Sequence, residues 1–395
     1  MLPVSLEATA VSLSEGRQIE RDLELKHHIP YSLVGLLPSL REVRIRDRLN
    51  QFASAYKDKE FEEEPEEYQA ISRVVSKMMS DLNYPSLVTK KVNSVMKAQL
   101  AYSEADDQYR EHFIHPFQTF LLGIVIIDKH YSLFQECFSR ELCKDPRTSV
   151  ESAWLLASVF HDHLKPVRQL LHLVRSIQRA RGEELIDAEE IPDVAELVNW
   201  MDRVYGILAT SAHLERSLTS GGARSQLIAV LDEYRRKENH GVLGGLNVLD
   251  WIRSSGEVTS TDVIAALAIA LHDGDYQNKR AFPNALFEAG IFPINFNNQP
   301  IACLLLWCDT AQEWGRWTQR IKVDTRLVKV TFEDNIVNLR LSFDDPKVIE
   351  DKLKEFQYVG ECMRESDLKF TVDFRFHPAS LGLKRRLGRK RHDRV

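Results

Sequence analysis

The chain has 395 residues, of which 44% are hydrophobic and 28% are charged, and its formal net charge is −6. These values are typical of a globular protein that is long enough for two or three domains. The acidic balance gives no general case for a nucleic-acid binder. The one dense basic stretch, residues 383–395, is interpreted as a solvated tail, and a contact of this tail with nucleic acid, anionic lipid or a partner is the less favoured alternative.

The five cysteines form no CxxC pair and are odd in number, which indicates reduced thiols. The first residues show no signal-peptide pattern, so we expect a cytoplasmic protein. The most apolar run, Leu121–Ile127, ends at Asp128 and is too short to span a bilayer. No membrane partner is expected.

Residues 1–100 are predicted to form an α-helical N-terminal extension. Helical patterns cover Ser32–Lys57 and Glu66–Met96. The acidic run Glu60–Glu67 lies between them and is interpreted as an exposed, charged helix start. The sequence does not indicate what this extension does.

Residues 101–322 are predicted to form a helical core. The predicted helices cover 106–142, 149–160, 164–180, 192–216, 224–237, 241–254, 260–272 and 300–319. The connection 273–299 is rich in Asn, Pro and Gly and is predicted to be a long loop. The fold class that follows is mainly α.

The pattern changes after the core. Two segments that alternate apolar and polar residues flank Glu333–Asn335 and predict a β-hairpin. A helix over 346–363 and a strand over 369–376 are expected next. Residues 323–382 are therefore predicted to form a small α+β unit of ββαβ order, which the basic tail 383–395 follows.

Candidate metal ligands lie at the edges of the apolar helical patterns of the core. The clearest is the adjacent pair His161 and Asp162, which follows an apolar helix and precedes Lys165. Further candidates occur before and after it: His115, His240, His272 and Asp309. Imidazoles and carboxylates that converge from separate helices are what a two-metal hydrolytic site requires.

The order of these residues and their local contexts resemble the HD superfamily of metal-dependent phosphohydrolases over residues 102–320. Phe160–Pro166 is similar to the family's His-Asp-x-x-Lys signature, and Asn239–Leu246 resembles its His-Gly helix start. His115 begins an apolar stripe, His272 ends an apolar helix, and Asp309 lies in what looks like the closing helix. The long stretch between Pro166 and His240 departs from the family pattern and suggests an inserted helical pair.

The resemblance implies an HD-type helical bundle with two divalent metal ions, of Mn, Fe, Co, Ni or Zn, with Mg as a further candidate. It implies that His115, His161, Asp162 and Asp309 hold the first ion and that His240 and His272 add the second, with Asp162 as a bridge. A metal-bound water would then attack a phosphate ester, most simply a nucleotide or cyclic nucleotide. Candidates for offsetting the phosphate charge are Lys165, Arg316 and, more weakly, Arg110.

Several of these residues have a second interpretation. His112 lies on nearly the same helix face as His115 and competes with it as the first ligand, although the longer apolar stripe follows His115. His163 is interpreted as exposed or as a neighbour of the ligands. His240 could simply begin a helix, and His272 could be a cation favoured by a helix C-terminus.

The remaining alternatives concern Arg316 and the function as a whole. Arg316 could pair with Glu313 on its own helix, and His130, His172 and His213 lie in ordinary amphipathic patterns and are interpreted as structural. A regulatory or binding protein with a structural metal site is the first alternative function. A metal-dependent nuclease is the second.

Overall fold

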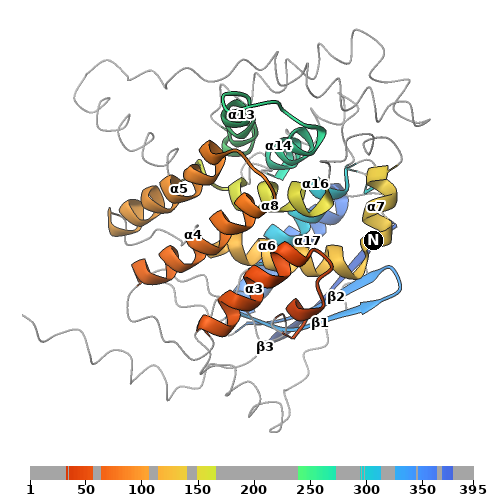
Figure 1. Ribbon diagram of the computed structural model, residues 1–395. Coiled ribbons are helices and arrows are strands. Elements are labelled where there is room, and N and C mark those ends of the chain that lie inside the picture. The colour runs from red at the N-terminus through yellow and green to blue at the C-terminus, as the bar shows by residue number, and fades with distance from the viewer. Residues whose placement is uncertain are drawn as a thin grey trace, which may run out of the picture.

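The computed structural model describes residues 33, 35–56, 64–105, 114–139, 149–165, 239–272, 294, 296–297, 299–312, 325–343, 346–362 and 367–376. The described part is mainly helical, with ten α-helices and one three-stranded sheet near the C-terminus (Figure 1). No helix of the described part has both the length and the apolar character that crossing a bilayer requires.

The N-terminal region contributes the helices α3 (Val43–Tyr56), α4 (Glu64–Asp81) and α5 (Ser86–Ala105). The helix predicted over 32–57 begins only at Val43, after a short 3-10 helix, η1 (Leu37–Ser39). The pattern over 66–96 is two helices rather than one, because Asn83 has a φ of 64° and ends α4. α4 begins inside the acidic run, as predicted.

The centre of the molecule is built from α6 (Ile114–Lys129), α8 (Val150–Phe160), α13 (His240–Arg253), α14 (Ser260–His272) and α16 (Pro300–Ala311). Every residue of α8 is buried, and α6, α14 and α16 are buried along almost their whole length. A helix that is apolar on all sides belongs in the interior of a protein. α8 packs against α6, α14 and α16, which surround it in Figure 1.

Two glycines let the central helices approach each other closely. A Cβ atom at Gly123 of α6 would lie 2.0 Å from the ring of Trp154 in α8. That ring is fully buried, and its Nε1 donates a hydrogen bond to the Phe120 carbonyl at 2.9 Å. A Cβ atom at Gly245 of α13 would lie 2.4 Å from the carbonyl oxygen of Ala266 in α14. Neither contact leaves room for a larger residue.

Two of the predicted core helices are shorter than expected. The helix over 106–142 is interrupted at His130, where α6 ends and α7 (Tyr131–Ser139) begins. The helix over 300–319 ends at Ala311, because Gln312 has an extended ψ of 100°. The helices predicted over 164–180, 192–216 and 224–237, and most of the loop 273–299, lie outside the described residues.

The C-terminal unit has the predicted ββαβ order. It comprises β1 (Thr325–Glu333), β2 (Ile336–Phe343), α17 (Pro346–Cys362) and β3 (Lys369–Phe376). β1 and β2 form an antiparallel hairpin, and β3 pairs with β2 in parallel after the crossover through α17. Asp334 takes a φ of 45° in the two-residue turn, a conformation that Asp tolerates better than most residues.

This unit docks on the C-terminal half of α16. Trp307 of α16 stacks on Phe370 of β3, with ring centroids 4.1 Å apart, and meets Phe356 of α17 at 6.2 Å. The buried Lys352 of α17 donates a hydrogen bond to the carbonyl of Thr310 at 3.2 Å. A cation is favourable there, because the last carbonyls of a helix lack partners within the helix.

Candidate metal centre

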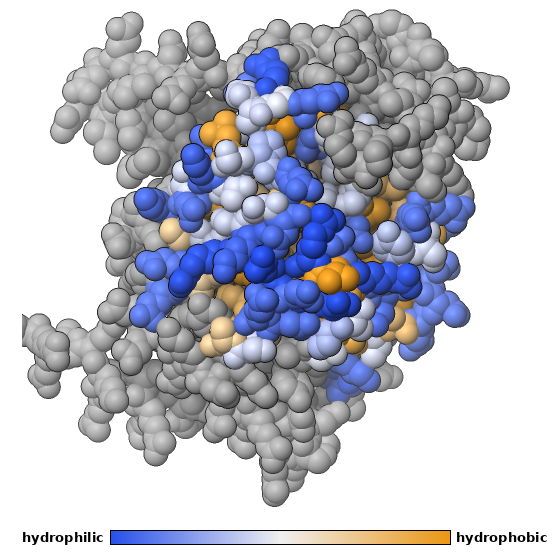
Figure 2. Space-filling view, viewed as in Figure 1, coloured by the Kyte–Doolittle hydropathy of each residue, from blue (hydrophilic) through white to orange (hydrophobic). Residues whose placement is uncertain are grey.

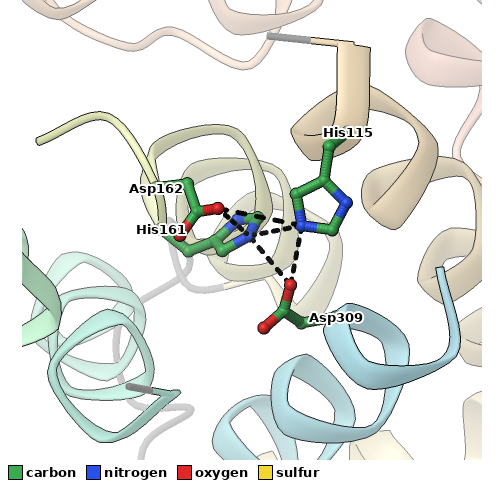
Figure 3. A group of neighbouring side chains, drawn as sticks. All are labelled: His115, His161, Asp162 and Asp309. Carbon is green, nitrogen blue, oxygen red and sulfur yellow. Dashed lines mark hydrogen bonds and ion pairs between the residues drawn. The ribbon is translucent and has the colours of Figure 1, made fainter. Parts of the chain in front are cut away.

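All six side chains predicted as metal ligands lie in one buried cluster at the centre of the helical core. They form two groups that share Asp162, and each group could hold a metal ion. The first group is His115, His161, Asp162 and Asp309, and the second is Asp162, His240 and His272. Figure 3 shows the first group, with the two imidazoles and two carboxylates pointing toward one another.

Each ligand is placed by the end of a helix. His161 is the C-cap of α8, and Asp162 follows it in the turn. His272 is the last residue of α14, and His240 is the first residue of α13. The two remaining ligands are His115, at the second position of α6, and Asp309, in the last turn of α16. The apolar bodies of these helices are packed together, so their polar ends meet in the interior.

The first group is compact. His115 Nε2 lies 2.6 Å from Asp309 Oδ1 and 3.2 Å from His161 Nε2. His161 Nε2 lies 3.5 Å from Asp309 Oδ1. Asp162 Oδ2 is 3.9 Å from His115 Nε2 and 3.7 Å from His161 Nε2. The four side chains therefore present their ligand atoms to one small volume.

The second group uses the other oxygen of Asp162. His240 Nε2 and His272 Nε2 each lie 3.3 Å from Asp162 Oδ1. The two oxygens of one carboxylate thus face two different sets of imidazoles. If both groups held an ion, Asp162 would be the ligand that they share.

The hydrogen bonds of the histidines show which ring nitrogens are available. His161 Nδ1 lies 2.7 Å from the Ser158 carbonyl and His272 Nδ1 lies 2.5 Å from the Ile269 carbonyl. A carbonyl oxygen only accepts, so both Nδ1 atoms carry hydrogen, and in the neutral rings the lone pair is on Nε2. These lone pairs face the carboxylate oxygens of Asp162 and Asp309. The electron-rich nitrogen and oxygen atoms repel one another unless a cation lies between them. The residues present therefore fit a metal ion.

The pKa shifts follow from burial and from the neighbours of each group. Burial alone raises the pKa of Asp309, but the contacts with His115 and His161 outweigh this and hold the pKa well below its usual range. Burial lowers the pKa of His272, against the opposing effect of its contact with Asp162. An ionised carboxylate and neutral imidazoles are the forms that bind metals.

Lys165 lies beside the cluster, as its position after the His-Asp pair predicts. Its Nζ is 2.7 Å from Asp162 Oδ2. The side chains of Lys165 and Asp309 remain 30% and 24% exposed, whereas those of His115, His161 and Asp162 are fully buried. Lys165 and Asp309 thus form the solvent-facing side of the cluster.

The exposed interpretation of His163 is wrong. The residue is buried, and its Nδ1 lies 2.6 Å from the Phe160 carbonyl. Its Nε2 lies 3.4 Å from Asn247 Nδ2, and its ring packs 5.0 Å from that of Trp251. Burial lowers its pKa to about 4. His163 is a packing neighbour of the cluster and belongs to neither ligand group. Arg316, Arg110 and His112 lie outside the described residues.

Two buried glutamines beside the cluster were not predicted from the sequence. Gln312 hydrogen-bonds through Oε1 to His115 Nδ1 and through Nε2 to Gln118 Oε1. All three side chains are buried. The signal was present, because Gln118 lies among apolar residues of α6 and Gln312 directly follows the apolar helix α16. A polar residue in such a position is costly to bury without a specific partner.

No protein-family model, curated protein or solved structure matches the chain. The geometry of the cluster therefore carries the functional argument.

Proposed function

We propose that the chain is an HD-type metal-dependent phosphohydrolase, with the catalytic unit in residues 101–322. The observation that carries this proposal is the position of Asp162, whose two oxygens face two separate groups of imidazoles. A structural metal site needs one closed ligand set. A shared carboxylate between two sets is instead a feature of two-metal hydrolytic centres.

The ligand assignment follows from the distances. The first ion would be held by His115, His161, Asp309 and Asp162 Oδ2, and the second by His240, His272 and Asp162 Oδ1. The second set has fewer protein ligands, which leaves positions for water and substrate. The imidazole-rich sets suit Mn, Fe, Co, Ni or Zn. When bound, the ions supply Lewis acidity and an activated water.

The chain's own residues then have distinct tasks. Each oxygen of Asp162 would contact one of the two ions. Asp162 would therefore orient the site and not accept a proton. Lys165 is partly exposed and pairs with Asp162, which supports the proposal that its ammonium group offsets charge on a substrate phosphate. Arg316 follows the end of α16 by a few residues and remains a candidate for the same task. The assignment of a nucleotide or cyclic nucleotide as substrate rests on the resemblance in the sequence.

Elemental analysis of the purified protein, together with hydrolysis assays, tests the proposal. The assays would use bis(p-nitrophenyl) phosphate and a nucleotide panel with added Mn²⁺, on the wild type, on Asp162→Ala and on Asp250→Ala. Asp250 is an aspartate of α13 that pairs with Arg253 outside the cluster. We expect about two ions per chain and turnover in the wild type and in the Asp250→Ala control. Asp162→Ala should lose the bound ions and the turnover.

The opposite result would favour a different class of protein. One ion or none, with no turnover of any substrate, would support a regulatory or binding protein. In that protein the ββαβ unit would be the place to look for a ligand, because it docks on the helix that carries Asp309. Turnover of single-stranded nucleic acid that is lost on deletion of 383–395, with small-ester hydrolysis kept, would support the nuclease.

A further inference from the structure

We propose that Gln312 and Gln118 are positioning residues that hold the ring hydrogen of His115 on Nδ1 and so keep Nε2 open for the metal. The inference rests on the proposed metal centre and adds two residues to it. Neither residue is a ligand. They act through His115, by a chain of hydrogen bonds that runs from His115 Nδ1 to Gln312 and from Gln312 to Gln118.

His115 needs such partners because of its place in the fold. His161 and His272 lie at helix C-termini, where the last carbonyls are free to accept from the Nδ1 atoms. His115 is the second residue of α6. The first turn of a helix offers unpaired N–H groups and no free carbonyl. Among the described residues, the acceptor at Nδ1 is a side chain, that of Gln312.

Gln312 supplies this acceptor, and Gln118 fixes its orientation. Gln312 Oε1 contacts His115 Nδ1, while Gln312 Nε2 donates to Gln118 Oε1. If the Gln312 amide were reversed, its NH₂ would face the ring nitrogen and its oxygen would face the Gln118 oxygen. The three side chains are at most 1% exposed, so water does not compensate for such a reversal. While Gln118 presents its oxygen to Gln312, it therefore favours the Gln312 orientation that places hydrogen on Nδ1.

The competing tautomer has a ready acceptor in Asp309. Its Oδ1 lies 2.6 Å from His115 Nε2. A hydrogen on Nε2 would therefore be bound by Asp309, and the ring would lose the lone pair that a metal needs. Asp309 and Gln312 are three residues apart at the end of α16 and contact the two opposite nitrogens of one imidazole. Which tautomer forms is decided by the strength of the Gln312 contact.

The test measures Zn²⁺ binding to the full-length protein in competition with a chromophoric chelator. His240→Ala, which removes a ligand of the second group, identifies the site that contains His115. We expect Gln312→Leu to weaken this site by about 10- to 100-fold, the usual effect of losing a partner of a metal-bound histidine, and to leave the other site unchanged. Gln312→Glu keeps an oxygen acceptor and should recover most of the affinity. The control is Gln299→Leu, which removes a buried glutamine from the other end of α16.

A double-mutant cycle separates this role from simple packing. In a His115→Ala background, Gln312→Leu should have no further effect on Zn²⁺ affinity, because the residue through which it acts is gone. An equal loss in both backgrounds would overturn the inference. So would unchanged affinity in Gln312→Leu itself. Thermal unfolding of the metal-free variants shows whether each one folds.

Gln118→Leu is the second variant, for the case that Gln312→Leu does not fold. It leaves the contact between Gln312 and His115 in place and removes only the acceptor that orients the amide. We expect Gln118→Leu to lose less Zn²⁺ affinity at the same site than Gln312→Leu does. Unchanged affinity in Gln118→Leu would count against the inference. A wild type that binds no Zn²⁺ would overturn the proposed function together with this inference. A wild type that binds two ions, beside an unaffected Gln312→Leu, would overturn the positioning role alone.

Discussion

The interior of the central helices and the interior of the ββαβ unit are built from different residues. The unit buries aromatic and aliphatic side chains, among them Phe343, Phe356, Phe370 and Phe374, which contact one another and Trp307. The central helices bury histidines, carboxylates and amides as well. Apolar burial stabilises a fold, whereas buried polar groups cost free energy unless they are satisfied. The comparison indicates that both regions bury apolar side chains, and that the described groups which could hold a metal lie in the helical core.

The two regions meet in α16, and one helix serves both. Trp307 points to the sheet, and Asp309, two residues later, points to the histidines. Residues two positions apart lie on roughly opposite faces of a helix. Figure 1 shows α16 close to both α17 and the other central helices, in agreement with the contacts. In Figure 2 the visible face of the N-terminal helices is largely hydrophilic.

Phe370→Ala is expected to give the largest change in stability and to leave the metal centre intact. The side chain is 5% exposed and stacks on Trp307, so its removal should lower the free energy of unfolding by about 3–5 kcal/mol. Denaturant unfolding measures this loss, and Zn²⁺ stoichiometry on the folded fraction measures the metal centre. Lys369→Ala, at an exposed position of the same strand, is the control.

A loss of bound metal in folded Phe370→Ala would break the comparison. It would mean that the ββαβ unit holds α16 in the position that the ligands need. If folded Phe370→Ala kept its metal but lost much of its stability, the packing of the ββαβ unit would affect the stability of the fold and not the metal centre.

The sequence predicts much of the fold because apolar periodicity determines which segments form helices. α8, α13 and α14 begin and end within one or two residues of the prediction. The alternating segments, with a turn between them, likewise predict β1 and β2. The breaks at His130 and Asn83 were not predicted. The signal at Asn83 is local, because Asn83 takes a positive φ and Pro85 directly precedes α5.

For the site, the sequence predicts the residues that converge but not how they are connected. The six candidate ligands meet in the structure because each follows or begins an apolar helix. The Nδ1 contacts of His161 and His272 are local, because each carbonyl belongs to the residue three positions earlier in the same helix. The surroundings of the two Asp162 oxygens and the contact of Gln312 with His115 depend instead on distances between helices far apart in the chain. No local pattern contains these distances.

Gly245→Ala is expected to have an intermediate effect that reaches the metal centre. The new methyl group would meet the backbone carbonyl of Ala266 at 2.4 Å, and backbone cannot move aside as a side chain can. α13 and α14 must then separate, at a cost of about 1–3 kcal/mol. His240 and His272 are carried by these two helices, so the second Zn²⁺ site should weaken while the first keeps its affinity.

Thermal unfolding and Zn²⁺ titration check this prediction. Gly256→Ala is the matched control, because a Cβ atom there meets nothing within 4 Å. Equal weakening of both sites would show that the two groups of ligands move as one body, contrary to the prediction.

The smallest expected effect concerns His130, which lies where the two regions meet. Its ring packs 5.7 Å from that of Phe332 in β1, and its Nε2 has no hydrogen-bond partner among the described residues. Burial lowers the pKa of His130. The unfolded chain therefore takes up a proton near pH 6.5 that the folded chain does not, so stability falls as the pH drops from about 6.5 to the lower folded pKa. Above that window His130 makes no pH-dependent contribution.

His130→Leu keeps an apolar contact with Phe332 and removes this titration. The melting temperature of the metal-free variant should therefore fall less than that of the wild type between about pH 7.5 and pH 5.5. The histidines of the metal centre are the same in both proteins, so the difference between the two slopes isolates His130. If the melting temperatures of the two proteins depended on pH identically, His130 would take up its proton as readily in the folded protein as in the unfolded chain. The junction between the core and the ββαβ unit would then be open to water rather than closed by the packing of Phe332.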